Sequence, residues 1–204
     1  SYTTSSLKPP GQPYSINLYN ADTAAKQVAE ARKNAQFIIV SMNWGKEDSG
    51  DVQPEQETIA QALTTSGADL IVGNGPHVTQ PAKILNGQDG HQSLVWFSLG
   101  NAVNSQLPSD NLFGGIGTVN IDIATQHMTN PGFLPTYMHY EWTAAEKSAG
   151  KLDARKNLMW YPLDAAKDAL AKSLNNTSID AQTARLKGII TKFAPVTIIK
   201  STDL

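Results

Sequence analysis

The sequence predicts a mixed α/β domain that is parallel in its first part and antiparallel in its second. In the first third of the chain, helical segments alternate with short apolar, β-branched segments. This order is typical of a parallel sheet with right-handed crossover helices. From residue 82 onward, apolar segments follow one another with only short polar segments between them, which favours antiparallel pairing.

The first two predicted elements are a helix over residues 20–34 and a buried strand over residues 36–42. Ala24, Val28 and Ala31 fall on one face of the helix at three- and four-residue spacing, and Asn20 or Asp22 is the expected cap. The segment QFIIVSM has the length and β-branched content of a buried strand. An acidic loop over residues 47–51 follows it.

A second helix and strand repeat this pattern. Pro54 occupies the first turn of a helix whose inward stripe contains Ile59 and Leu63, and Gly67 is the expected stop. Residues 69–73 then form another apolar strand. A helix that connects two buried strands places them side by side and parallel.

The second part of the chain contains two predicted strand pairs and two predicted helices. Residues 82–85 and 93–99 form a hairpin, and residues 116–123 pair with residues 133–142. Helices are predicted over residues 163–174 and 179–193, separated and capped by residues 175–178. We therefore expect one domain over residues 1–204, with a sheet-and-helix core at 1–142 and a helical tail at 143–204.

Composition excludes several classes of function. The 204 residues carry a formal net charge of −2 without clustered Lys and Arg, so we expect no nucleic-acid partner. The absence of cysteine excludes disulfides and thiolate metal sites and suits an extracytoplasmic protein. The apolar runs are far shorter than the roughly 20 residues of a membrane span, so this chain is predicted to span nothing.

Three polar segments follow predicted strands. They are residues 43–47 (NWGKE), 73–77 (GNGPH) and 98–101 (SLGN). Ligands of open α/β sheets gather beyond the carboxyl ends of strands, so these segments are candidates for one site. The residues expected to line its pocket are Trp44, Gly45, Glu47, Asn74, Gly75, Ser98 and Asn101, with His77 beside them.

The three segments resemble motifs of the bacterial capsule-synthesis family of the CapA/PgsA type, which is linked to poly-γ-glutamate. Members of that family show His-Trp-Gly-x-Glu, then Gly-x-His-Pro-His, then Ser-Leu-Gly-Asn, in this order. The resemblance implies the C-terminal part of a calcineurin-like metallophosphoesterase fold, an αββα sandwich with mixed sheets. It extends from about residue 1 to residue 123 and fades in the tail.

The chain departs from the family pattern at two expected metal ligands. Asn43 and Gly75 stand where the family has histidines, and only His77 of the paired histidines is present. The family's upstream motifs, an aspartate after the first strand and an Asn-Asn-His segment, do not occur in the chain. Each ion of a two-metal site needs several protein donors, so we expect His77, even with Asn43, to hold no metal tightly here. Manganese or zinc is expected only in a full-length protein that supplies the other ligands.

Individual residues keep two interpretations. His77 is either a surviving metal or anion ligand or a turn histidine whose ring bonds backbone. Asn43 is favoured as a structural strand-end residue. Trp44 either lines a groove or packs in the core.

The resemblance implies a protein that assists the synthesis, export or anchoring of an anionic surface polymer at the bacterial cell surface. Its partners would be the polymer or capsule-synthesis membrane proteins. One alternative is a metal-dependent phosphoesterase completed by a missing N-terminal half, and another is a polymer- or partner-binding module. As this chain alone, we expect it to be inactive as an enzyme. If upstream strands are missing, an inner strand becomes an edge, so we also expect self-association, for example as a homodimer.

Overall fold

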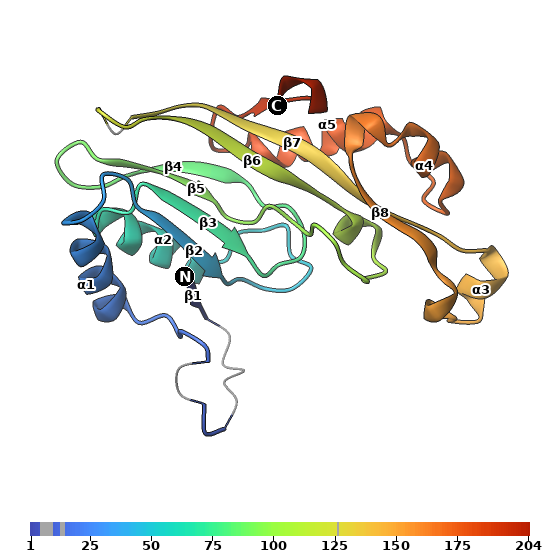
Figure 1. The fold of residues 1–204 in the computed structure, drawn as a ribbon, viewed down its shortest axis with the longest axis horizontal. Helices are drawn as coiled ribbons and strands as arrows, with labels where there is room; N and C mark the ends of the chain where they lie inside the picture. The colour runs from blue at the N-terminus through green and yellow to red at the C-terminus, as the bar shows by residue number, and fades with distance from the viewer. Residues whose placement is uncertain (5–9, 13–14, 126) are drawn as a thin grey trace.

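The computed structural model describes residues 1–4, 10–12, 15–125 and 127–204, and it contains two mixed sheets with flanking helices (Figure 1). The first sheet has the order β1-β2-β3-β5-β4, formed by β1 (Tyr2–Thr3), β2 (Ile39–Asn43), β3 (Leu70–Asn74), β5 (Gln92–Trp96) and β4 (Ala82–Asn86). Strands β1, β2, β3 and β5 are parallel, and β4 pairs antiparallel with β5. The predicted switch from parallel to antiparallel pairing is confirmed.

The second sheet is built on one long hairpin. Strand β6 (Phe113–Asp122) pairs antiparallel with β7 (His127–Glu141), and β7 pairs antiparallel with β8 (Lys156–Pro162). A short strand, β9 (Thr197–Ile198), runs parallel to β7. The predicted antiparallel pairing of these two strands is therefore confirmed, but its register differs: residues 118–122 pair with residues 127–132, because β7 begins six residues before the predicted strand.

The helices of the first sheet begin and end where the sequence predicts. Helix α1 (Ala21–Arg32) begins after Asn20, whose side chain accepts a hydrogen bond from the Thr23 amide. Helix α2 (Pro54–Thr65) has proline in its first turn, and the chain turns at Gly67 with φ of 97°. Both helices lie on the same side of the first sheet (Figure 1).

The predicted helical tail needs correction. Residues 143–204 contain the short helices α3 (Ala144–Ser148), α4 (Lys167–Lys172) and α5 (Ile179–Ile190), but also strands β8 and β9. The single helix expected over 163–174 is a 3-10 turn, η3 (Leu163–Ala165), followed by α4. Strand β8 forms because the Met-Trp-Tyr segment at 159–161 finds a partner strand in β7, a long-range pairing that local periodicity does not reveal.

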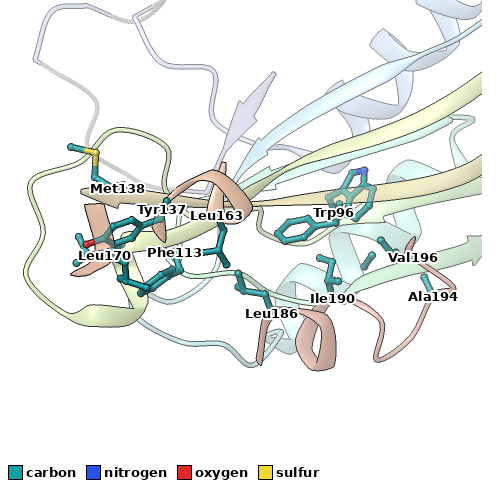
Figure 2. Packing of buried hydrophobic residues seen from close by; sticks show 14 of the residues in the cluster. Trp96, Phe113, Tyr137, Met138, Leu163, Leu170, Leu186, Ile190, Ala194 and Val196 are labelled. Atoms are coloured by element: carbon teal, nitrogen blue, oxygen red, sulfur yellow. The ribbon is translucent and has the colours of Figure 1, made fainter. Parts of the chain in front are cut away.

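Two apolar clusters hold the layers together. One joins α1 and α2 to the first sheet through residues such as Val28, Leu63 and Ile71. The other joins both sheets to the C-terminal helices, and Figure 2 shows Leu186 and Ile190 of α5 among its side chains together with Trp96 and Phe113. This arrangement agrees with the αββα sandwich expected from the motifs.

Candidate functional site

The carboxyl ends of the parallel strands bring the three predicted segments to one edge of the first sheet. Asn43, the last residue of β2, is paired with Asn74, the last residue of β3. The Trp44 amide donates to the Asn74 carbonyl at 2.8 Å, which extends the pairing one residue into the loops. The third segment follows β5, the next parallel neighbour of β3.

Glycines allow the loops to pack directly against each other. Gly75 has a φ of 121°, and a Cβ there would lie 2.3 Å from the Trp44 carbonyl oxygen. A Cβ at Gly73 would lie 2.2 Å from the Phe97 carbonyl oxygen and 2.4 Å from Trp44 Nε1. The backbone therefore leaves no space for a side chain at either position.

His77 lies at the centre of the candidate site. Its backbone is in the left-handed region, with φ of 65°, and its side chain is partly exposed. Nδ1 lies 3.0 Å from the side-chain oxygen of Asn101, and Nε2 lies 3.7 Å from Glu47 Oε1. One residue from each predicted segment thus meets here, and the His77 ring bonds a side chain rather than the backbone carbonyl considered above.

Residues outside the predicted motifs complete the site. Asn101 Nδ2 donates to Gln106 Oε1 at 2.7 Å and to the Asn111 main-chain carbonyl at 3.3 Å. Asn111 Nδ2 donates to Asp48 Oδ1 at 2.7 Å and to Gln106 Oε1 at 2.9 Å. This amide network consists of Asn101, Gln106 and Asn111, and it connects His77 with the acidic loop after β2.

Other predicted residues have structural roles. Asn43 donates from Nδ2 to Thr3 Oγ1 at 3.0 Å, which connects β2 to β1. Trp44 is buried, donates from Nε1 to the Phe97 carbonyl at 2.8 Å and stacks on the Phe97 ring, so it belongs to the core. Ser98 is also buried and accepts a bond from the Gly100 amide at 3.3 Å.

Two further predicted pocket residues, Gly45 and Asn74, lie beside His77 at the edge of the sheet. Gly45 has a φ of 83° and lies against the Gln56 side chain, and Gln56 in turn donates to Gln80 Oε1 at 2.8 Å. Asn74 is exposed at the end of β3. These two predicted pocket residues shape the edge of the sheet beside His77.

The donor set does not fit a two-metal centre. Gly75 has no side-chain donor, and the two predicted ligands, Asn43 and His77, bond Thr3 and Asn101, respectively. Within the described part of the chain, no group of three or more His, Cys, Asp and Glu side chains is placed to hold a metal ion. A pair of catalytic cations needs several such donors for each ion.

Comparison with known proteins identifies the family. The model of the family described as "Bacterial capsule synthesis protein PGA_cap" matches residues 2–106, just over half of the chain. The chain belongs to the PGA_cap family. This assignment accounts for the order of the three motifs and agrees with the metallophosphoesterase-like layering of the fold.

Two relatives support the same family. The chain is 38% identical over 79 residues to the PGA biosynthesis protein CapA of Bacillus subtilis (strain 168), a match that covers 39% of this chain and 20% of the relative. It is 36% identical over 99 residues to the capsule biosynthesis protein CapA of Bacillus anthracis, covering 47% of this chain and 23% of the relative. The matched part thus spans about a fifth of each relative's length.

A cavity of 460 Å³ lies away from the strand-end site, between the β4–β5 loop and the β6–β7 hairpin end. None of the predicted site residues lines it. Its lining includes Gln88, His91, Leu94, His127 and Met128.

Over the described residues, the helices are too short or too polar to cross a membrane.

Sequence reasoning missed Asp48 as a bonding partner and missed Gln106 and Asn111 entirely. A signal was present: the segment over residues 101–111 is rich in Asn and Gln directly after the Ser-Leu-Gly-Asn motif. Amide-rich loops are common on protein surfaces, however, so the composition alone does not distinguish a buried network from solvated side chains.

Proposed function

We propose that this PGA_cap chain assists the synthesis, export or anchoring of an anionic capsule polymer at the bacterial cell surface, outside the cytoplasm. It does so by binding, without two-metal hydrolysis by its own residues. The family and the names of the two relatives support the link to a capsule. Its proposed partners are the polymer, of which poly-γ-glutamate is the first candidate, and capsule-synthesis membrane proteins.

The conformation of Gly75 is the main observation that supports binding rather than two-metal hydrolysis. The family pattern has a histidine here, but this backbone leaves no room for a Cβ, so the second imidazole is excluded by the fold as well as by the sequence. The His77 ring is left with a hydrogen bond to Asn101 and with Glu47 Oε1 3.7 Å from its Nε2, an arrangement that suits ligand binding. A site with one imidazole and neutral amides can bind a polar ligand but does not clamp two cations.

Self-association remains part of the proposal for a specific reason. Strand β8 lies at the end of the β6-β7-β8 order, and its side chains Leu158 and Met159 are 49% and 54% exposed. An exposed strand edge with apolar side chains can pair with another chain. A second copy of this chain is a suitable partner, and sedimentation or light scattering would detect the dimer.

The test compares polymer binding with hydrolysis. The chain is passed over immobilised poly-γ-glutamate and over immobilised dextran, a neutral polymer, in buffer with a chelator. We expect retention on poly-γ-glutamate alone, weakened by His77→Ala and unchanged by His127→Ala, which removes an exposed histidine at the first position of β7. Equal behaviour on both polymers, or no effect of His77→Ala, contradicts the proposed site.

The alternative is a phosphoesterase that is completed by residues N-terminal to this chain, with manganese or zinc as its cofactor. It predicts that the full-length protein, but not this chain, binds two metal ions, so metal binding and Mn²⁺-dependent hydrolysis of a generic phosphodiester are measured for both proteins. We expect no turnover above the blank from this chain. Metal-dependent hydrolysis by the full-length protein that disappears in His77→Ala would favour the alternative.

A further inference from the structure

The amide network has only one consistent set of hydrogen-bond directions. Asn101 Nδ2 lies 3.3 Å from the main-chain carbonyl of Asn111, which can only accept. Asn111 Nδ2 lies 2.7 Å from the carboxylate of Asp48, which accepts when ionised. These two contacts fix the nitrogen side of both amides, and Gln106 then accepts from both through Oε1.

These hydrogen-bond directions determine which nitrogen of the His77 ring carries the proton. Because the nitrogen of Asn101 is committed to Gln106 and Asn111, its oxygen faces His77 Nδ1 at 3.0 Å. An amide oxygen can only accept, so Nδ1 carries the proton. In the neutral ring, Nε2 then has a free lone pair, and it lies 3.7 Å from Glu47 Oε1.

The site therefore presents two acceptors side by side. His77 and Glu47 side chains are 35% and 80% exposed, so both are accessible to a ligand. A neutral Nε2 and a carboxylate both lack a hydrogen, and a ligand that supplies an N–H group satisfies either of them. A ligand carboxylate would instead be repelled by the negative charges of Glu47 and the adjacent Asp48.

We propose that Asn101, Gln106 and Asn111 are positioning residues that hold His77 in the Nδ1-protonated form, so that Nε2 and Glu47 together bind an N–H donor of the ligand. The inference rests on the proposed function, and it specifies which part of the polymer is recognised: the N–H groups of its amide backbone or its terminal amine. We do not expect the polymer carboxylates to bind at this pair of acceptors, because Glu47 is itself a carboxylate.

The burial of Asn111 supports a positioning role. Its side chain is 1% exposed, and its Oδ1 is buried without a hydrogen-bond partner in the part of the chain that the structure describes. An unpaired buried acceptor is unfavourable for stability. Burial of Asn111 thus lowers the stability of the protein, while its amide N–H groups hold Asp48 and Gln106 in place beside His77.

The tautomer can be measured without any ligand. Long-range ¹H–¹⁵N spectra of ¹⁵N-histidine-labelled protein are recorded under alkaline conditions, which favour the neutral form of an imidazole ring. We expect the proton of His77 on Nδ1. Asn101→Asp keeps an acceptor and should retain this form, whereas Asn101→Leu should shift the ring to the Nε2-protonated form. A proton on Nε2 in the unaltered protein would overturn the proposal, and so would an unchanged tautomer in Asn101→Leu.

Donor binding is tested with two cations of equal charge. Methylammonium has N–H donors and tetramethylammonium has none, so each is titrated at constant ionic strength while the His77 and Glu47 signals are followed. We expect shifts with methylammonium alone, and about threefold or greater weakening by Glu47→Gln, a change of the size expected for one exposed ionic contact. Asp153→Asn removes an exposed charge elsewhere and should have no effect. Equal shifts with both cations, or none with either, would contradict the paired acceptor.

The two proposals fail in different ways. Methylammonium binding at His77 without retention on poly-γ-glutamate contradicts the proposed function and leaves the donor site intact. Retention on the polymer with the tautomer on the other nitrogen contradicts the donor site and leaves the proposed function intact.

Discussion

Replacing Gly75 by histidine should destabilise the protein instead of restoring a metal ligand. The substitution introduces the residue that the family pattern places at this position. In this chain, however, φ is 121° and a Cβ would lie 2.3 Å from the Trp44 carbonyl oxygen and 3.0 Å from the Trp44 amide nitrogen. Neither atom can move freely, because the Trp44 amide donates to the Asn74 carbonyl.

The magnitude follows from two contributions. An L-residue forced into a glycine-type conformation costs about 1–3 kcal/mol, and overpacking a tight contact costs about 1–3 kcal/mol more. A loss of about 3 kcal/mol is a large part of the 5–15 kcal/mol that stabilises a typical domain. For a domain of this size it lowers Tm by about 6–12 °C.

The assay is thermal and urea unfolding of Gly75→Ala, Gly75→His and Gly50→Ala. Gly50 lies in the loop after β2, and a Cβ there meets nothing within 4 Å, so its variant should stay within about 0.5 kcal/mol of the parent. Both Gly75 variants should lose similar stability, because the Cβ is the clashing atom. A Gly75→His protein with unchanged Tm, or one that binds Mn²⁺ tightly, would refute this account of the site.

Three further predictions concern the core, the second sheet and α5. Trp44→Phe removes the indole donor to the buried Phe97 carbonyl and should destabilise the protein by about 1–3 kcal/mol in urea unfolding; an unchanged midpoint would mean that another group satisfies that carbonyl. The hydrogen bond from His139, followed by that from Asn157, lowers the pKa of Glu141 below its usual range. This interaction therefore stabilises the protein at pH values above the ordinary carboxyl pKa, and the stabilisation is lost as pH falls through the lowered pKa of Glu141. Glu141→Gln should make the free energy of unfolding less dependent on pH under acidic conditions; parallel pH profiles of variant and parent would contradict this. Gly188→Ala fills an exposed position in α5 where a Cβ meets nothing within 4 Å, and it should raise stability by about 0.5–1 kcal/mol; a lower Tm would contradict the helical assignment.

The features that the sequence predicts best are those that depend on residues close together in the sequence. Asn20 as a cap, Pro54 in a first turn and Gly67 as a stop are local signals, and all three occupy those positions in the structure. Strand β8 depends on β7, and its Trp160 is paired with Met138, more than twenty residues earlier. No local pattern contains that information, so the sequence alone predicts a helical tail where the structure has β8.

The contacts of the candidate site are also of two kinds, those that the motif order predicts and those that depend on tertiary folding. The motif order brings Glu47, His77 and Asn101 together, because parallel strands end at one edge of a sheet. The contact between Asp48 and Asn111 joins residues 63 positions apart, and it depends on how the loop after β5 folds back. The directions of the amides depend on two fixed acceptors, the Asn111 carbonyl and the Asp48 carboxylate, whose positions follow from the tertiary structure.

The strand pairing that ends at Asn43 and Asn74 restricts which residue position 75 can hold. Because Asn43 is paired with Asn74, the residues that follow them, Trp44 and Gly75, are pressed together at the sheet edge. A side chain at position 75 requires the Trp44 turn to move, and Trp44 is held by its bond to the main-chain carbonyl of Phe97, the residue directly after β5. A second imidazole therefore requires coordinated changes in at least two loops. Single substitutions should leave the one-histidine, amide-supported site in place, which is why its ligand chemistry is better sought in hydrogen-bond donors than in a pair of metal ions.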